Sequence, residues 1–377
     1  MAPKSITPDR ELVVELLGYL AGIRPFPAVV NELDYDQLAY WLIENDLASL
    51  AQIRFKESCP DLAARLQADL FSTTAANALH WHHLREIDAY FASNGMPAVL
   101  LKGAALAETV YDGPEQRSMA DVDLWLHKQH IARACPLMED LGFRNLENAA
   151  RPLELQALAD GEIQYVNSDQ PPTLVELHLS PFSGWWLKRT AAIDSQDIWV
   201  RREPLQDWRT FSQLAAEDAV IHMAVHLAVN HQFGLSPLRS ILDILLTDQV
   251  RQVDWLLLAG RAREWRVATA VWLALVVTQQ LTGAASFQTA LHELQPSAWR
   301  RRRLQDFISA DSILAGRDIR DEKERYLFLL LLVDRPWDAG KLMVRTLWPE
   351  GEWLDARYGG SVDHWQHIRR LIAQRGV

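Results

Sequence analysis

Hydrophobic residues recur at helical spacing through the first quarter of the chain. Between positions 10 and 94 the apolar residues follow the three-to-four-residue period of a buried helix side: Leu12, Val13, Leu16, Leu17 and Leu20, then Leu38 and Leu42, then Leu62, Leu66 and Leu70. The last helix is predicted over 62–93, because Asn94-Gly95 is a typical C-terminal stop and Pro97 follows it. This region is therefore predicted to be all helical.

The pattern becomes strand-like between positions 96 and about 211. Strands are predicted at 98–101, 122–126, 163–166 and 174–179, and the last three alternate polar and apolar residues with period two. Helices are predicted between them at 105–111 and 130–141. Strands and helices in this order indicate a small α/β unit with a mixed sheet.

Helical periodicity returns from Leu214 onward. The clearest predicted helices are 219–230, 238–250, 255–263, 268–281, 325–332 and 353–372. The predicted fold class is therefore α+β, with a small mixed-sheet domain between N-terminal helices and a C-terminal helical domain. The predicted boundaries are 1–95, 96–212 and 213–377.

Composition narrows the classes of function. The chain has 377 residues with a formal net charge of -11, which argues against nucleic acid as a partner. No stretch reaches the roughly 18 consecutive apolar residues that a membrane span needs. The two cysteines, Cys59 and Cys135, are far apart and give no sign of an oxidising compartment. We expect a cytoplasmic protein with half-buried or buried thiols.

The candidate chemistry lies where the first predicted strand ends. Lys102-Gly103 passes directly into a helix, so backbone N–H groups and the helix dipole could hold a phosphate, and Gly103 would let it approach closely. Asp121 and Asp123 are two apart on a predicted strand and project from one face. Two such carboxylates repel each other unless a cation lies between them.

Mg²⁺ is the cation that suits this pair, because it takes carboxylate and phosphate oxygens. In a two-metal arrangement one ion activates the attacking oxygen and the other stabilises the triphosphate. A third carboxylate is expected on a neighbouring strand, and Glu176 is the best candidate because it alternates with apolar neighbours. His178 would lie on the same strand face as Glu176. It could act as a general base, orient a carboxylate, or simply line the cleft.

These motifs resemble the polymerase-β-like nucleotidyltransferase superfamily, whose signature is a hydrophobic-Gly-Gly/Ser turn followed by Asp-x-Asp/Glu. The resemblance is to its uncharacterised bacterial nucleotidyltransferase family, often found beside peptide and polysaccharide biosynthesis genes. It spans roughly 100–255 and is carried by 101–105, Arg117, 121–124, 176–178 and 238–243. The turn departs from the signature, since Ala104 stands where Ser or Gly is usual and removes a hydroxyl that could touch phosphate.

The resemblance implies a Mg²⁺- or Mn²⁺-dependent nucleotidyltransferase that binds an NTP. Asp121, Asp123 and Glu176 would hold metal, with His178 among the catalytic residues. The expected nucleotide-binding residues are Lys102, Gly103, Ala104, Arg117, Arg239 and Asp243. The acceptor would be a peptide, a protein or a small molecule. The alternative from another class is a non-catalytic nucleotide- or peptide-binding protein on a degenerate transferase fold.

Several of these residues have purely structural alternatives. Lys102 and Arg117 could instead form ion pairs with Asp121 or Asp123. Arg239 and Asp243 are four apart on a predicted helix and could pair with each other or form an interdomain salt bridge.

Two groups of histidines invite a zinc interpretation. For the first group, His222, His226 and His231, no carboxylate follows at the spacing of a metalloprotease site. We expect these three to line the cleft or to pack within the helical domain. The second group is His80, His82 and His83, and the sequence shows no further ligand cluster to support a metal there.

Overall fold

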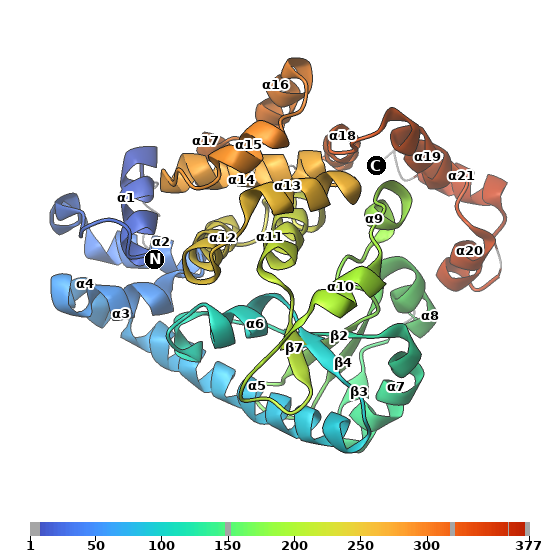
Figure 1. The fold of residues 1–377 in the computed structure, drawn as a ribbon, viewed down its shortest axis with the longest axis horizontal. Helices are drawn as coiled ribbons and strands as arrows, with labels where there is room; N and C mark the ends of the chain where they lie inside the picture. Colours follow the sequence, from blue (N-terminus) through green and yellow to red (C-terminus); the bar gives the residue numbers. More distant parts are fainter. Residues whose placement is uncertain (1–7, 148–151, 317–320, 361, 374–377) are drawn as a thin grey trace.

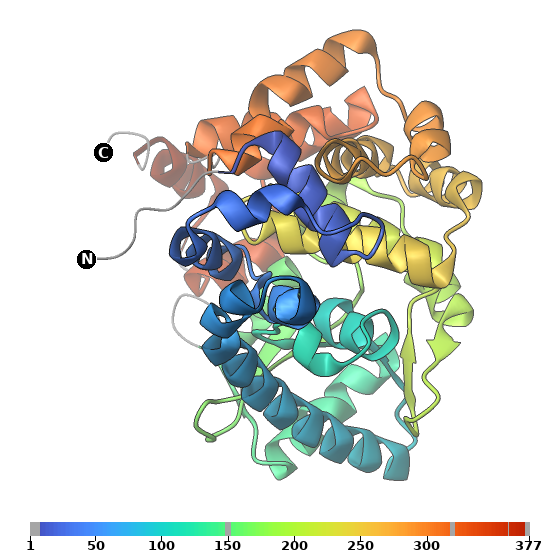
Figure 2. The same cartoon turned by 90° about the vertical axis from the view of Figure 1, so that its left-hand side faces the viewer.

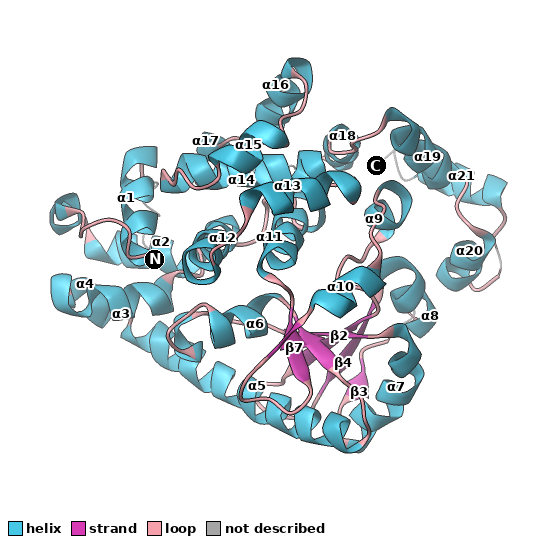
Figure 3. Cartoon of the chain, in the orientation of Figure 1, coloured by secondary structure: helices cyan, strands magenta, loops and turns pink. Residues whose placement is uncertain are grey.

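The computed structural model describes residues 8–147, 152–316, 321–360 and 362–373. It confirms the α+β class: a seven-stranded mixed sheet lies among helices, with a large group of C-terminal helices on one side (Figures 1 and 3). The described part of the chain contains no helix long and apolar enough to cross a membrane. The domain boundaries near 95 and 212 stay a prediction, and residues 1–7 of the first region lie outside the described residues.

The N-terminal region is helical, as predicted. Its helices are α1 (Arg10–Leu20), α2 (Tyr35–Glu44), α3 (Ala48–Ser58), α4 (Pro60–Arg65) and α5 (Gln67–Ser93), with a 3₁₀ turn, η1 (Ala28–Glu32). The single helix predicted over 62–93 is divided at Leu66, whose N–H bonds to the Ala63 carbonyl in a tight last turn of α4. The predicted stop is confirmed, since Gly95 has a φ of +63°. Figure 2 shows α5, in blue to teal, as the long helix that crosses the lower part of the molecule.

The sheet has the strand order β3-β4-β5-β2-β1-β7-β6. Its strands are β1 (Ala98–Leu100), β2 (Val122–Leu126), β3 (Arg144–Asn145), β4 (Glu162–Val166), β5 (Leu174–His178), β6 (Glu203–Pro204) and β7 (Phe211–Gln213). β2 and β5 are parallel, whereas β1 is antiparallel to β2 and β4 is antiparallel to β5. The four predicted strands are confirmed. β3, β6 and β7 were missed because two or three residues are too short to show alternation, whereas the equally short β1 lies in a run of four apolar residues, 98–101.

Shorter elements connect the strands. The helices are α6 (Lys102–Thr109), α7 (Ile131–Asp140), α8 (Leu153–Leu155), α9 (Trp185–Thr190) and α10 (Ser195–Arg201). The remaining turns are η2 (Pro114–Gln116), η3 (Lys128–His130) and a π-helical turn, η4 (Gln156–Asp160). The predicted helix at 105–111 begins earlier, at Lys102, immediately after β1. The helix predicted at 130–141 corresponds to α7.

The C-terminal region is helical throughout its described part. It contains α11 (Ala216–Val225), the π-helical turn η5 (His226–Asn230), α12 (Pro237–Arg251), α13 (Trp255–Glu264), α14 (Ala268–Thr282), α15 (Gln288–Glu293), α16 (Ala298–Phe307), α17 (Ala310–Leu314), α18 (Glu322–Leu331), α19 (Pro336–Leu347), α20 (Gly351–Tyr358) and α21 (His364–Ala373). The single helix predicted over 353–372 is wrong. Gly359 and Gly360 both have positive φ and end α20.

Two hydrophobic cores surround the sheet. The first joins one sheet face to α5, α6 and α7, through residues such as Leu100, Leu124, Leu177 and Ile87. The second joins α1–α4 to α11–α14, and it also takes Val99 and Trp125 from the other sheet face. The N-terminal helices therefore pack with the C-terminal helices rather than forming a separate core. The predicted thiol environments are confirmed, with Cys59 buried and Cys135 half-buried.

Alternation along the strands makes the sheet two-faced. In β2 and β5 the apolar residues Val122, Leu124, Val175 and Leu177 enter the core beneath the sheet. The residues between them must then point to the opposite face, because side chains alternate along a strand. The polar residues of β2, β4 and β5 are therefore gathered on the face opposite α5 and α7.

Candidate active site

A cavity of about 390 Å³ lies between this polar sheet face and the helices α11 and α12. The sheet side contributes acids and a histidine, and the helical side contributes histidines and an arginine. The polar lining residues include Lys102, Arg117, Asp121, Asp123, Glu162, Glu176, His178, His222, His226, His231, Arg239 and Asp243. Most of the predicted site residues are thus brought into one cavity.

The turn between β1 and α6 has an unusual backbone. Lys102 has a φ of +43°, a conformation that residues with a Cβ rarely adopt. Gly103 follows it, and a Cβ there would lie 2.6 Å from Nη1 of Arg117 and 3.1 Å from Cγ of Met119. Glycine is therefore needed for the close approach of the Arg117 segment. Ala104 is fully buried in the core beneath the sheet and is not among the residues that line the cavity, so its contact with a nucleotide stays a prediction.

Strand register brings the acids together. Asp123 of β2 is the direct partner of Glu176 of β5, and Glu176 is in turn the partner of Gln164 of β4. Gln164 Nε2 donates to Glu176 Oε1 at 2.6 Å. Asp121 lies just before β2, is half-buried and also lines the cavity. Glu176 therefore lies on the same face as Asp123, where the sequence predicted it.

Two cationic groups already compensate the most buried acid. Lys102 Nζ lies 2.8 Å from Asp123 Oδ1, and His178 Nε2 lies 2.7 Å from the same oxygen. His178 Nε2 is also 3.6 Å from Glu176 Oε2. The ion-pair alternative for Lys102 is thus realised with Asp123, and His178 orients that carboxylate.

The pKa values follow from this arrangement. Burial opposes ionisation of Asp123, but Lys102 and His178 outweigh it and hold the pKa of Asp123 well below its usual range. Burial also opposes the charged form of His178, yet its bonds to Asp123 and Glu176 raise its pKa to about 9. His178 is therefore a proton-carrying donor near neutral pH. Burial, then the charges of Asp123 and Glu176, raise the pKa of Asp121 to about 6.

Sequence reasoning missed two polar residues of β4 on the same face. Glu162 is the antiparallel partner of His178, with Oε2 3.9 Å from His178 Nδ1. Burial and the neighbouring Glu176 raise the pKa of Glu162 to about 7. The signal was available, because Glu162 and Gln164 alternate with apolar Ile163 and Tyr165.

The donor set fits a hard divalent cation. Ligand atoms of Asp123, Glu176 and His178 lie within 4.8 Å of one another, and Asp121 adds a fourth group on the cavity wall. Carboxylate oxygens are the ligands that Mg²⁺ prefers. Among the described residues, one other group, on α5, has metal-ligating atoms this close together.

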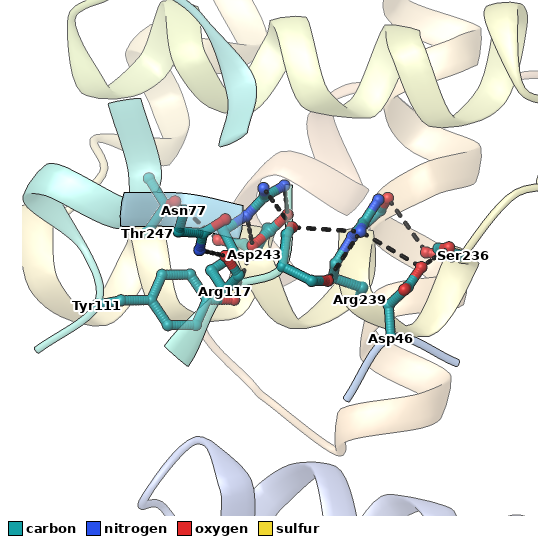
Figure 4. A network of polar contacts seen from close by, with 10 residues as sticks. Asp46, Asn77, Tyr111, Arg117, Ser236, Arg239, Asp243 and Thr247 are labelled. Atoms are coloured by element: carbon teal, nitrogen blue, oxygen red, sulfur yellow. Dashed lines mark hydrogen bonds and ion pairs between the residues drawn. The ribbon is translucent and has the colours of Figure 1, made fainter. Parts of the chain in front are cut away.

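Arg117 and Asp243 form a buried ion pair between the sheet region and α12 (Figure 4). Arg117 Nε donates to Asp243 Oδ1 at 3.0 Å and Nη2 donates to Oδ2 at 2.8 Å. Tyr111 Oη donates to Oδ1 at 2.7 Å, and Asn77 Nδ2 donates to the Arg117 carbonyl at 2.8 Å. Arg117 was expected near Asp121 or Asp123; its partner is Asp243, because α12 packs over the turn.

Arg239 does not pair with Asp243, although the two share a helix face. Its Nη1 contacts Asp46 Oδ2 at 3.3 Å and Ser118 Oγ at 3.3 Å (Figure 4). Burial, then the nearby Arg117, lowers the pKa of Arg239. Each of the two residues forms an ion pair with another predicted region: Arg239 with Asp46 of the N-terminal helices, and Asp243 with Arg117 of the sheet region.

Three histidines form the helical wall of the cavity, as expected. His222, His226 and His231 all line it, and the rings of His226 and His231 are 4.1 Å apart between centroids. Burial, then the charge of Lys102, lowers the pKa of His222 to about 3 and that of His226 well below its ordinary value. These rings are therefore neutral at physiological pH. The π-helical turn η5 carries His226, and such turns are frequent at functional sites.

The buried pair predicts a large effect on stability. Asp243→Asn leaves the Arg117 guanidinium buried without its anion, so we expect a loss of roughly 3–5 kcal/mol in the free energy of unfolding. Urea unfolding of the two proteins measures it. The control is Asp306→Asn, which removes an exposed pair with Arg303 and should change stability by less than about 1 kcal/mol. Equal midpoints for the two variants would contradict a structural role for the pair.

Comparison with known proteins agrees with the resemblance. A family described as "Uncharacterised nucleotidyltransferase" matches residues 31–283, which include the sheet, the cavity and α12. No curated protein and no solved structure matches the chain significantly. The matched segment contains the Gly103 turn, the Asp121/Asp123 pair and Glu176 together. The chain therefore belongs to the family of uncharacterised nucleotidyltransferases.

Proposed function

We propose that this protein is a Mg²⁺- or Mn²⁺-dependent nucleotidyltransferase that moves an NMP from an NTP to a hydroxyl or similar acceptor. The observation that carries the proposal is the register of Asp123 with Glu176 in a cavity that also contains the Gly103 turn. Family membership supports the transferase fold. The metal, the NTP and the acceptor belong to the proposal.

The cavity offers two sources of positive potential for nucleotide phosphates. α6 begins at Lys102, so its unpaired backbone N–H groups lie at the cavity next to Gly103. Arg239 enters from α12 and is partly buried. Arg117 is saturated by Asp243, so we assign it to positioning the turn, and we assign Asp243 the same role.

Asp121, Asp123 and Glu176 would hold the metal, with His178 orienting Asp123. Bound Mg²⁺ would supply electrostatic stabilisation of the charge that develops on the phosphate oxygens. In the reaction an acceptor oxygen attacks the α-phosphorus, the bond from that phosphorus to the bridging oxygen breaks, and pyrophosphate leaves. The acceptor's proton would pass to a carboxylate. Glu162 is a second candidate for this role beside Glu176, because its raised pKa lies near neutrality.

Lys102 has a specific part in this proposal. Its Nζ contacts the Asp123 oxygen that a metal would need, so the ammonium serves as counter-ion to the acids when no metal is bound. The φ of +43° at Lys102 is strained for a residue with a Cβ. Strained residues of this kind are concentrated at functional sites, which supports a functional role for the Lys102 side chain. With Asp123 bound to a metal, the Lys102 ammonium would be available to contact the nucleotide phosphates.

The helical wall would contact the acceptor. Its neutral histidines can donate or accept hydrogen bonds without adding charge, which suits a hydroxyl of a peptide, protein or small molecule. Acceptor identity is part of the proposal and rests on this chemistry alone.

Asp121→Asn should weaken Mg²⁺-dependent NTP binding and stabilise the metal-free protein. Because the pKa of Asp121 is raised in the folded protein, its ionised carboxylate lowers the free energy of unfolding above a pH of about 4. Removing the charge should therefore raise Tm in EDTA. Calorimetry with each of the four NTPs, with and without Mg²⁺, measures binding. The matched control is Asp112→Asn, an exposed aspartate outside the cavity lining. Unchanged NTP affinity in Asp121→Asn would contradict the metal site.

Asp123→Ala should slow transfer by roughly a hundredfold or more, because stabilisation of the transition-state charge is lost. The protein is incubated with labelled ATP, GTP, CTP or UTP, Mg²⁺ or Mn²⁺, and a lysate or peptide fraction, and label transfer and pyrophosphate are measured. Equal transfer by the variant and the unaltered protein would contradict the assignment. NTP binding without pyrophosphate release under every condition would favour the non-catalytic nucleotide-binding alternative.

Lys102→Met tests the counter-ion. Without the ammonium the carboxylates of the cavity repel each other, so we expect a lower Tm in EDTA. We also expect Mn²⁺ to bind at least about tenfold more tightly in the absence of nucleotide. NTP binding in Mn²⁺ should nevertheless weaken, because a phosphate contact is lost. The control is Lys128→Met, an exposed lysine in η3. An unchanged Tm together with unchanged Mn²⁺ affinity would show that Lys102 is not the counter-ion.

A further inference from the structure

A second group of metal-ligating side chains lies on α5, away from the cavity. His82, His83 and Glu86 have ligand atoms within 4.8 Å of one another, and none of the three lines the cavity. His83 Nδ1 lies 3.2 Å from Glu86 Oε2, and His82 Nε2 lies 3.7 Å from the same oxygen. The two histidines reach one carboxylate because Glu86 is three and four residues further along the helix.

His83 has acceptor oxygens on both sides of its ring. Its Nε2 lies 2.7 Å from Asp169 Oδ2 and its Nδ1 lies 3.2 Å from Glu86 Oε2, and carboxylate oxygens can only accept. Asn167 Nδ2 lies 2.8 Å from Nε2 and donates to the same Asp169 oxygen at 2.9 Å. The position between Nδ1 and Glu86 therefore suits a proton or a metal ion. A metal ion bound to Nδ1 takes the place of a proton there and leaves the contact of Nε2 with Asp169 intact.

The distances from the two histidines to Glu86 are close to those expected around one tetrahedral zinc ion. Bonds of about 2.0–2.1 Å at tetrahedral angles separate two ligand atoms by about 3.3 Å and two imidazole centroids by about 5 Å. The observed separations of 3.2 Å and 3.7 Å bracket the first value, and the His82 and His83 centroids are 5.2 Å apart. Two imidazoles with one carboxylate are also a ligand set that zinc accepts.

We propose that His82, His83 and Glu86 form a zinc site on the surface of α5, with Asp169 orienting His83 through its second nitrogen. A carboxylate hydrogen-bonded to a ligating histidine is a common support for bound zinc. The side chains of His82 and Glu86 are 64% and 49% exposed, so the fourth position faces solvent and would take water. Sequence reasoning missed Glu86, although its place three residues after His83 and four after His82 was visible, and it could not place Asp169, which lies on the connection between β4 and β5.

The site would tie α5 to that connection. His83 is held by Phe143, whose ring lies edge-on at 5.6 Å, and by Asp169, so it is fixed on both sides. β4 and β5 carry Glu162 and Glu176, and zinc at His83 would therefore fix the hairpin relative to the helix beneath the sheet. This inference does not depend on the proposed transferase activity.

The experiment uses full-length protein carrying Asp121→Asn and Asp123→Asn, which removes metal ligands from the cavity. Zn²⁺ calorimetry should give one site, and Co²⁺ should give the visible absorption bands of tetrahedral coordination. Adding His82→Ala or Glu86→Gln, both at exposed positions that should not disturb folding, should weaken Zn²⁺ binding at least tenfold and abolish those bands. Asp169→Asn should weaken it by roughly tenfold to a hundredfold.

The matched control is His292→Ala, which removes an exposed histidine elsewhere on the surface. It should leave Zn²⁺ affinity and the Co²⁺ spectrum unchanged. Absence of a one-to-one site in the Asp121→Asn, Asp123→Asn protein would overturn the proposal. Zn²⁺ affinity that is equal in His82→Ala, Glu86→Gln and His292→Ala would overturn it too, because binding would then lie elsewhere.

Discussion

The cavity depends on one buried ion pair, between Arg117 and Asp243. Arg117 precedes β2, and Asp243 lies on α12, so the pair joins the sheet to the helices that close over it. Both side chains are removed from water, and their bidentate geometry together with the Tyr111 hydroxyl satisfies the carboxylate. This pairing also explains Gly103, because a Cβ at that position would lie only 2.6 Å from Nη1 of the paired Arg117. An arginine that could have been a phosphate ligand is thus a structural link.

Charge compensation is the second constraint on the site. Strand register places Asp123 beside Glu176, and five carboxylates line one cavity, four from the sheet side and Asp243 from α12. Lys102 and His178 both contact Asp123, so the protein supplies its own cations to the most buried acid. A metal-free site of this kind can fold without strong repulsion. A divalent cation could replace Lys102 as the positive charge beside Asp123. The charge balance that stabilises the metal-free site is therefore linked to the metal binding that we propose.

The two faces of the sheet have separate tasks. One face packs on α5, α6 and α7 and contributes only to the core, whereas the other presents acids toward α11 and α12. The helical wall is uncharged at its three histidines, while the sheet wall is acidic. The cavity therefore has one side suited to cations and phosphates and another suited to a neutral acceptor. α5 carries its own cluster of histidines on the far side of the sheet.

Local sequence pattern alone determined the α+β class, the strands β1, β2, β4 and β5, and most of the helices, because hydrophobic period is a property of neighbouring residues. It also predicted that Asp123, Glu176 and His178 share one sheet face, since period two assigns residues to a strand face, and the register of β2 with β5 confirms that placement. Their catalytic role stays a prediction. Pairing across the molecule was decided only by the tertiary structure. Arg117 with Asp243, Arg239 with Asp46, and His83 with Asp169 are separated by 126, 193 and 86 positions, and no local pattern encodes such contacts. The burial of Ala104 and the short strands β3, β6 and β7 were decided in the same way, by the packing of distant segments around them.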